Sequence, residues 1–151
     1  MTKTWGPCTW YLFHSLAEKI KEEHFLTLRL ELLGMIKQIC SSLPCPECAG
    51  HATQYITRIN ANRIQTKNDM KMMLLSFHNE VNTKHNKPIF NETQLTEKYS
   101  KARTAEVVKY FVQVWNTPNR NPKMMSNSLH KNLITTNFIK WWKKNYMCFF
   151  P

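Results

Sequence analysis

Apolar side chains recur at intervals of three and four residues through most of this 151-residue chain, and this spacing strongly constrains its fold. One such stripe is formed by Leu26, Leu30, Leu33 and Ile36. Residues with this spacing share one face of an α-helix, which has about 3.6 residues per turn. Only three glycines interrupt the chain. The spacing and the composition together predict an all-α fold.

Prolines and capping residues divide this pattern into separate helices. Asn68 or Asp69 is expected to cap the fourth helix, and Pro88 to end it. The segment 107–115 is apolar and β-branched, so that periodicity leaves it open between helix and strand. We expect helices over residues 10–20, 26–43, 45–59, 70–85, 92–103 and 129–142.

The length corresponds to one domain, and 42% hydrophobic residues suffice for a core. We expect the domain over residues 1–115, and a linker with an amphipathic helix over 116–151 that packs on the domain or at an interface. No apolar run reaches about 18 residues, so no membrane span is expected. The first residues lack the apolar segment of a secretory signal, so we expect the chain not to be secreted.

The formal net charge of +11 raises the alternative of a nucleic-acid-binding protein. The positive residues are scattered, with short clusters such as Lys143-Lys144. We therefore expect no nucleic-acid partner, and we interpret the charge as favouring an acidic partner or an anionic cofactor.

The motif Cys45-Pro46-Glu47-Cys48 is typical of a redox-active dithiol. The N-terminus of a helix carries partial positive charge and unpaired N–H groups, both of which favour a thiolate. Pro46 suits the first helical position, where no backbone donor is needed. Two sulfurs one turn apart can close into a disulfide and reopen by thiol–disulfide exchange.

A structural zinc site is the main alternative for this motif. Cys40, Cys45, Cys48 and His51 have the spacing of a Cys3His ligand set. In that case the chain would be a zinc-stabilised helical binding module. The motif alone does not decide between the two.

Two further motifs flank the cysteines. Trp5, Gly6, Trp10 and His14 form the pattern WGxxxWxxxH. After the cysteines comes HNxVNxxxxK, formed by His78, Asn79, Val81, Asn82 and Lys87. In this order, over residues 5–103, the motifs resemble the Erv/ALR family of FAD-linked sulfhydryl oxidases. The chain is most similar to the short forms of large cytoplasmic DNA viruses.

The resemblance implies a four-helix bundle with a short fifth helix that holds FAD, followed here by a helical C-terminal extension. Residues 1–115 would form the FAD-binding sulfhydryl oxidase domain. Gly6 would allow the backbone to approach the cofactor, and Lys87 would meet its pyrophosphate. No metal is implied. By similarity, FAD would be bound by Gly6, Trp10, His14, Cys48, His51, His78, Asn79, Val81, Asn82, Lys87 and Tyr99.

The resemblance also implies a mechanism. A substrate thiolate would attack Cys45, and Cys48 would pass the electrons to FAD, from which they reach oxygen to give hydrogen peroxide. The expected partners are a protein dithiol, such as a thioredoxin-like or small Cys-x-x-Cys carrier protein, molecular oxygen, and a second copy in a homodimer formed through the first two helices. The expected location is the host cytoplasm, at virus factories, and the virion, for a late protein of virion assembly.

The chain departs from the family pattern in its other cysteines. It has no second Cys-x-x-Cys to act as a shuttle, and Cys8, Cys40 and Cys148 stand alone. We therefore expect the substrate to reach Cys45 directly. Cys148, in an apolar tail, is considered both as a partial shuttle and, preferably, as a plain free thiol.

Overall fold

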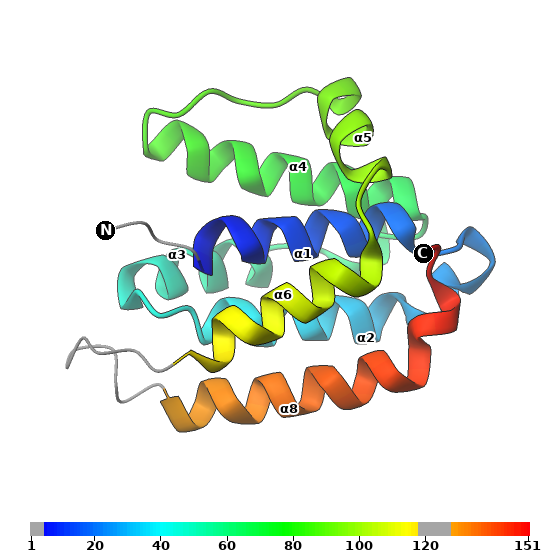
Figure 1. The fold of residues 1–151 in the computed structure, drawn as a ribbon. Helices are drawn as coiled ribbons and strands as arrows, with labels where there is room; N and C mark the ends of the chain where they lie inside the picture. Colours follow the sequence, from blue (N-terminus) through cyan, green and yellow to red (C-terminus); the bar gives the residue numbers. More distant parts are fainter. Residues whose placement is uncertain (1–4, 118–127) are drawn as a thin grey trace.

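The computed structural model describes residues 5–117 and 128–151 of the chain (Figure 1). Its helices in chain order are α1 (Trp5–Lys19), α2 (Glu22–Ser41), α3 (Pro46–Thr57), the 3-10 helix η1 (Ala61–Arg63), α4 (Lys67–Lys84), α5 (Glu92–Ser100), α6 (Thr104–Asn116), α8 (Ser128–Asn145) and the 3-10 helix η2 (Tyr146–Cys148).

The regular structure of the described residues is helical, apart from one isolated antiparallel bridge between Ile20 and Phe149. The prediction of an all-α fold is thereby confirmed. Most of the predicted linker, residues 118–127, lies outside the described part of the chain. Within the described ranges, no helix is both long enough and apolar enough to cross a membrane.

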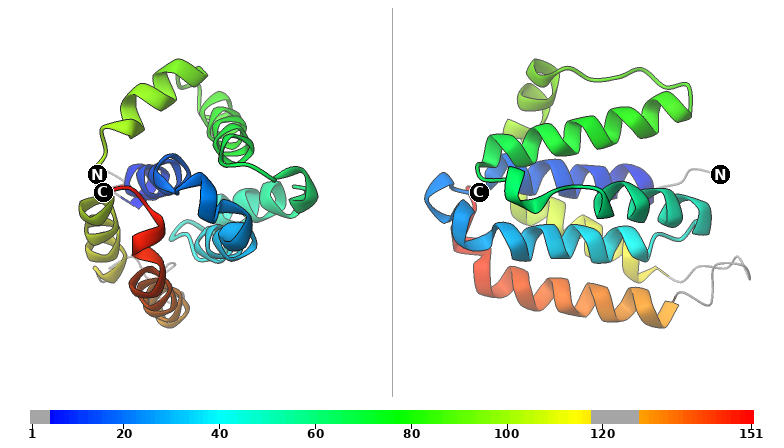
Figure 2. Two further views of the ribbon diagram at one scale, coloured as in Figure 1. Left: turned by 90° about the vertical axis from the view of Figure 1, so that its right-hand side faces the viewer. Right: turned by 180° about the vertical axis from the view of Figure 1, so that it is seen from behind.

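Helix α1 runs through the middle of the molecule, as the end-on view shows (Figure 2). It packs against α4, α5 and α6. Helix α2 packs against α3 and α8, and α8 also packs against α6. Figure 1 shows α5 standing across one end of α1 and α4, whereas the long helices lie roughly along one direction.

One hydrophobic cluster joins the C-terminal helices to the rest of the core. Phe13 of α1, Phe111 and Trp115 of α6, and Phe138 of α8 are all at most 2% exposed. Each such side chain stabilises the fold by about 1.5–3 kcal/mol relative to leaving it in water. The segment that periodicity left open is thus a helix, because Val108, Phe111 and Trp115 face this core at helical spacing.

Helix boundaries differ from the predicted ones where capping residues decide them. Helix α4 begins at Lys67, because the Thr66 side chain accepts a hydrogen bond from the Asp69 N–H while the Asp69 carboxylate accepts one from the Thr66 N–H. The expected cap at Asn68 or Asp69 was therefore wrong. Helix α2 begins at Glu22, four positions before Leu26, with two glutamates in its positive first turn.

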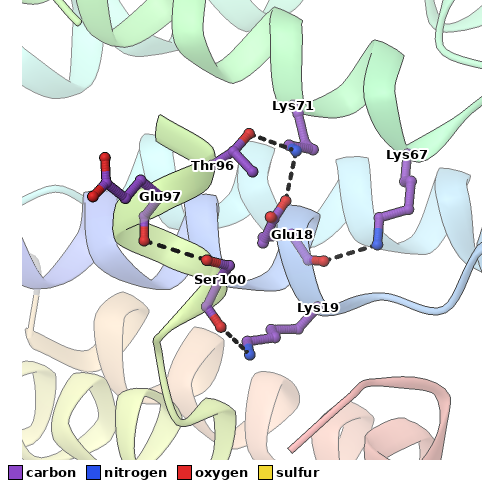
Figure 3. Close-up of polar contacts among 7 residues, drawn as sticks. All are labelled: Glu18, Lys19, Lys67, Lys71, Thr96, Glu97 and Ser100. Carbon is purple, nitrogen blue, oxygen red and sulfur yellow. Dashed lines mark hydrogen bonds and ion pairs between the residues drawn. The ribbon is translucent and has the colours of Figure 1, made fainter. Parts of the chain in front are cut away.

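A polar network ties together the ends of α1, α4 and α5 (Figure 3). The Lys71 ammonium lies 2.6 Å from the Glu18 carboxylate and donates to the Thr96 hydroxyl at 3.1 Å. Lys67 Nζ donates to the Glu18 carbonyl at 2.8 Å, and Lys19 Nζ to the Ser100 carbonyl at 2.7 Å. The side chains of Glu18 and Lys71 are only 11% and 12% exposed, so this ion pair is largely withdrawn from water.

The last residues of the chain are bound to the turn between α1 and α2. The Lys21 N–H donates to the Cys148 carbonyl at 2.8 Å, and the Phe150 N–H donates to the Lys19 carbonyl at 2.7 Å. The Thr104 hydroxyl donates to the Phe150 carbonyl at 2.7 Å. The backbone around Cys148 is therefore held in place at this end of the molecule.

Candidate active site

The two motif cysteines lie at the N-terminus of α3. Cys45 is the N-cap residue and Pro46 occupies the first turn, as the sequence predicted. The Cys48 N–H donates to Cys45 Sγ at 3.3 Å, so that the sulfur takes the place of an ordinary capping oxygen. Both side chains are partly exposed, and Cys48 packs against the hydrophobic core. This arrangement places Cys45 outside the helix and Cys48 on its inner side.

Four of the predicted cofactor residues form a stack of rings between α1, α4 and α5. Trp10 lies parallel to His78, with ring centroids 4.1 Å apart and an interplanar angle of 5°. His14 stacks on Tyr99 at 4.7 Å and 27°. The sequence motifs placed these residues far apart along the chain, and the fold brings them together. This aromatic stack offers flat, apolar surfaces of the kind on which planar ring systems bind.

The two histidines of the stack are hydrogen-bonded to each other, with His14 Nε2 2.9 Å from His78 Nδ1. Burial, and then the charges of His78 and Lys98, lower the pKa of His14 to about 3. Burial, and then Lys98 and Lys87, lower the pKa of His78 to about 4. Both imidazoles are therefore neutral near pH 7. One ring donates its N–H and the other accepts with its lone pair.

The other ring nitrogen of His14, Nδ1, is buried and has no hydrogen-bond partner among the described residues. A buried polar atom of this kind costs about 1–3 kcal/mol unless a ligand or water satisfies it. It lies in the aromatic stack, where the positive charge of Lys98 acts on both histidines and that of Lys87 acts on His78. Flat ring surfaces, an unpaired polar atom and nearby positive charge fit a cofactor with aromatic rings and a diphosphate, as FAD has.

Asn79 and Asn82 fix the loop after α4 rather than pointing freely into the stack. The Asn79 amide donates to the Phe90 carbonyl and accepts from the Phe90 N–H, both at 2.9 Å. Asn82 Nδ2 donates to the Pro88 carbonyl at 3.1 Å, and the Lys87 N–H donates to the Asn82 carbonyl at 2.8 Å. Through these bonds, the asparagines hold Lys87 and Phe90 beside the stack.

Lys98 is a candidate cofactor residue that the motifs did not single out. Its Nζ lies 5.4 Å from the Tyr99 ring centroid and 5.8 Å from those of Tyr11 and Phe90. These rings come from separate segments, so only the fold reveals the cluster. The available signal was its place next to Tyr99 in a helix that the motifs had already assigned to the cofactor.

The remaining predicted residues lie on α1, α3 and α4. His51 of α3 bonds to Glu80 of α4, with Nε2 and Oε2 3.1 Å apart. Val81, which follows Glu80 on α4, packs against the hydrophobic core. A Cβ added at Gly6 would meet no atom within 4 Å. The chain's own packing therefore does not require glycine at this position.

A second pair of rings connects the dithiol helix to the stack. Tyr55 of α3 stacks on Phe77 of α4 at 4.5 Å and 9°, and Phe77 meets the Trp10 ring edge-on at 4.9 Å. The ring contacts thus run without a break from the helix that carries Cys48 to the histidines.

The alternative of a zinc site is not supported. Among residues 5–117 and 128–151, no His, Cys, Asp and Glu side chains are grouped to hold a metal ion. Cys40 is only 1% exposed, and His51 turns Nε2 to Glu80. The alternative Cys3His set suggested by spacing is therefore not assembled in this part of the chain.

The remaining cysteines are not placed to exchange with the dithiol of Cys45 and Cys48. Cys8 and Cys40 are buried, and burial raises the pKa of each thiol to about 12. Cys148 is bound beside Lys21, which precedes α2, whereas Cys45 follows the end of α2. A helix of 20 residues is about 30 Å long. Cys148 therefore does not fit a shuttle role toward Cys45 of the same chain.

Comparison with known proteins supports the same site. The family model for Erv1/Alr matches residues 7–100. The chain is 31% identical over 98 residues to a protein of Invertebrate iridescent virus 3 named as a candidate FAD-linked sulfhydryl oxidase, covering 64% of this chain and 66% of that protein. It is 28% identical over 116 residues to the FAD-linked sulfhydryl oxidase of an African swine fever virus isolate (Warthog/Namibia), covering 75% and 97%.

No solved structure matches the chain at a comparable level of significance. The family match nevertheless covers more than half of the sequence and contains the dithiol, the aromatic stack and the asparagine-held loop. The chain belongs to the Erv1/Alr family.

Proposed function

We propose that the protein is a FAD-dependent thiol oxidase that makes disulfide bonds in protein substrates. The observation that carries this function is the pairing of two elements in one fold. A dithiol lies at the N-terminus of α3, with Cys45 as the N-cap. The aromatic stack lies between α1, α4 and α5, and its buried His14 Nδ1 has no hydrogen-bond partner in the described part of the chain. Neither a plain structural bundle nor a metal site requires this combination.

The cysteines divide the work according to their positions. Cys45, at the N-cap and outside the helix, receives the attack of a substrate thiolate. Cys48, on the inner side against the core, is the leaving sulfur. The positive end of the α3 dipole stabilises the negative charge that develops on either sulfur, and the Cys48 N–H already donates to Cys45 Sγ. The substrate dithiol leaves as a disulfide after its second sulfur attacks the first.

The aromatic stack would hold the cofactor through its rings. Trp10, His14, His78 and Tyr99 would bind its aromatic parts, and Lys87 and Lys98 would supply positive charge for its diphosphate. Because both histidines are neutral, they could hydrogen-bond to the cofactor without placing a buried charge against it. When bound, FAD supplies the acceptor for the two electrons of the dithiol and passes them to molecular oxygen.

The purified chain tests this function directly. It should show the visible absorption of an oxidised flavin and consume oxygen, with formation of hydrogen peroxide, when a dithiol is added. Cys45→Ser and Cys48→Ser should each abolish turnover while the flavin stays bound. Cys148→Ser is the matched control and should keep wild-type turnover. A folded, colourless protein that takes up no FAD would contradict the assignment.

The homodimer uses the outer face of α2. Helices α6 and α8 already cover parts of α1 and α2. On α2 the side chains of Leu26 and Leu30 remain 64% and 59% exposed, one turn apart. Sedimentation should show a dimer that Leu30→Glu converts to a monomer, whereas Gln113→Glu, at an exposed position of α6, serves as a control for added charge.

The substrate is a protein dithiol, such as a Cys-x-x-Cys carrier, that reaches Cys45 without a shuttle pair. We place the enzyme in the cytoplasm of a virus-infected cell, because the relatives matched above are viral proteins, and in the virion. In that reducing compartment, ordinary disulfides rarely persist, so a dedicated oxidase has a clear use. Trapping of mixed disulfides with the Cys48→Ser variant in infected cells, followed by fractionation, tests both points.

A further inference from the structure

A hydrogen-bonded acid–base pair lies beside the dithiol. His51 follows Cys48 by three positions on α3, and its Nε2 is 3.1 Å from Oε2 of Glu80 on α4. The two side chains are 22% and 45% exposed. Residues three apart share one face of a helix, with Cβ atoms about 5–6 Å apart.

The direction of the His51 side chain follows from helix geometry. Long side chains in a helix lean toward its N-terminus and cover the turn before their own Cα. For His51, that turn is the one that carries Cys48. Glu80 binds Nε2, so Nδ1 is the ring nitrogen left for the dithiol side. A carboxylate bonded to an imidazole fixes the orientation of the ring.

Holding α3 against α4 does not explain the pair. The stacked rings of Tyr55 and Phe77 already join these helices one turn further along. A half-exposed ion pair contributes only about 0–1 kcal/mol to stability. The position of the pair next to the reactive sulfurs is thus better explained by chemistry than by packing.

We propose that Glu80 is a positioning residue that holds the His51 ring next to Cys48, where the ring, when protonated, stabilises the thiolate that Cys48 becomes. This inference rests on the proposed thiol oxidase function. A bond forms between the substrate sulfur and Cys45 Sγ, the Cys45–Cys48 bond breaks, and its electron pair stays on Cys48 Sγ. The substrate sulfur is oxidised to a mixed disulfide as Cys48 is reduced, and no further reactant is needed.

Other titratable groups surround the imidazole and enter the pH dependence. Tyr55, one turn after His51, has its pKa raised by burial and then by Glu80, with Arg58 acting in the opposite direction. Helix α2, which packs against α3, contributes the buried thiol of Cys40. The groups at helical spacing from the pair are Glu47, Cys48 and Tyr55 on α3 and Lys84 on α4.

The test follows the reactivity of Cys48 rather than turnover. In the full-length, cofactor-loaded Cys45→Ser protein, the alkylation rate of Cys48 by iodoacetamide is measured by mass spectrometry from about pH 6 to about pH 9.5. Glu80→Gln should slow alkylation about threefold to tenfold near pH 7. The two rates should converge at the upper end, where the thiol ionises without help.

Two controls separate charge from structure. Glu31→Gln removes one negative charge from an exposed position of α2 and should leave the rate unchanged. Tyr55→Leu removes the stacked rings but keeps the pair. Because burial raises the pKa of Tyr55, its hydroxyl stays protonated over this range, and any effect should be equal at every pH. Because Glu80 acts through His51, Glu80→Gln should add nothing in a His51→Asn background.

Either of two results overturns the proposal. One is an effect of Glu80→Gln that is absent near pH 7 or equal at every pH, and the other is an effect that persists in the His51→Asn background. Alkylation needs neither oxygen nor turnover. A protein without flavin would therefore contradict the oxidase function while leaving this measurement readable.

Discussion

The imidazoles of His14 and His78 share a single hydrogen bond, 2.9 Å between His14 Nε2 and His78 Nδ1, inside the aromatic stack of Trp10, His14, His78 and Tyr99. His14 is 2% exposed and His78 is 8% exposed. One nitrogen of each ring is used within the pair, so the pair presents its other nitrogens to a ligand. Protonation of both rings would place two N–H donors against each other and break this bond.

Stability should therefore depend on pH through these histidines. Their pKa values fall from 6.5 to about 3 for His14 and about 4 for His78 on folding. Below pH 6.5 these two histidines bind protons in the unfolded chain but not in the folded one. The free energy of unfolding therefore falls as the pH drops toward 4. Each histidine contributes up to about 1.4 kcal/mol per pH unit in this window.

Urea unfolding at several pH values between these limits measures this slope. His78→Gln removes one titrating group and should flatten the slope by up to about 1.4 kcal/mol per pH unit. His85→Gln removes an exposed histidine and should leave the slope as it is. An unchanged slope in His78→Gln would show that His78 titrates normally in the folded protein.

The five cysteines should separate into reactive and unreactive groups. Burial raises the pKa of Cys8 and Cys40 to about 12, so that almost no thiolate is present near pH 7. N-ethylmaleimide should label Cys148 and the dithiol in the native reduced protein, and Cys8 and Cys40 only after unfolding. Peptide mapping of the labelled sites provides the measurement. Native labelling of Cys40 as fast as that of Cys148 would contradict the burial of its thiol.

The ion pair between Glu18 and Lys71 should be costly to break from one side. Glu18→Gln leaves the Lys71 ammonium largely buried without its partner, and should cost about 2 kcal/mol of unfolding free energy. The double variant Glu18→Leu with Lys71→Met should recover most of this loss. Glu97→Gln removes a pair whose side chains are 70% and 76% exposed, and should cost less than about 0.5 kcal/mol. Equal losses for the two single variants would argue against the buried pair.

Helix α8 should behave as part of the main core. Phe138 is 0% exposed and contacts the Phe111 ring of α6. Phe138→Ala should lower the free energy of unfolding by about 3–5 kcal/mol, in one transition monitored by circular dichroism. Leu133→Ala, at a position that is 58% exposed, should change it by less than about 0.5 kcal/mol. Separate melting of α8 would contradict a shared core.

The sequence was a good guide to the helices and a poorer one to their boundaries. The start of α3 was predictable because Pro46 and the helix N-terminus impose a local rule. The start of α4 was predicted at the wrong residue because Thr66 lies in a polar stretch with the composition of a loop. Only the structure shows the hydrogen bonds between Thr66 and Asp69 that begin the helix there. The helical state of α6 depends on packing against α1, which a nine-residue apolar window does not contain.

In the candidate site, motifs identified residues but not what they touch. Trp10, His14, His78 and Tyr99 meet as expected from the resemblance. Lys98 belongs to no motif and becomes visible only when three separate segments place rings around it. A cation among aromatic rings is a tertiary feature, so spacing along one helix carries little information about it.

The binding of residues 148–150 to the turn after α1 has a consequence for how the protein is made. Trp115 donates to the Thr9 hydroxyl across 106 positions, and the Ile20–Phe149 bridge spans still more of the chain. Contacts of such long sequence separation form late, because closing a large loop comes first. During translation, the central helix α1 is synthesised well before the C-terminal segments against which it packs. Premature termination should therefore yield an aggregation-prone, protease-sensitive chain rather than a smaller working enzyme.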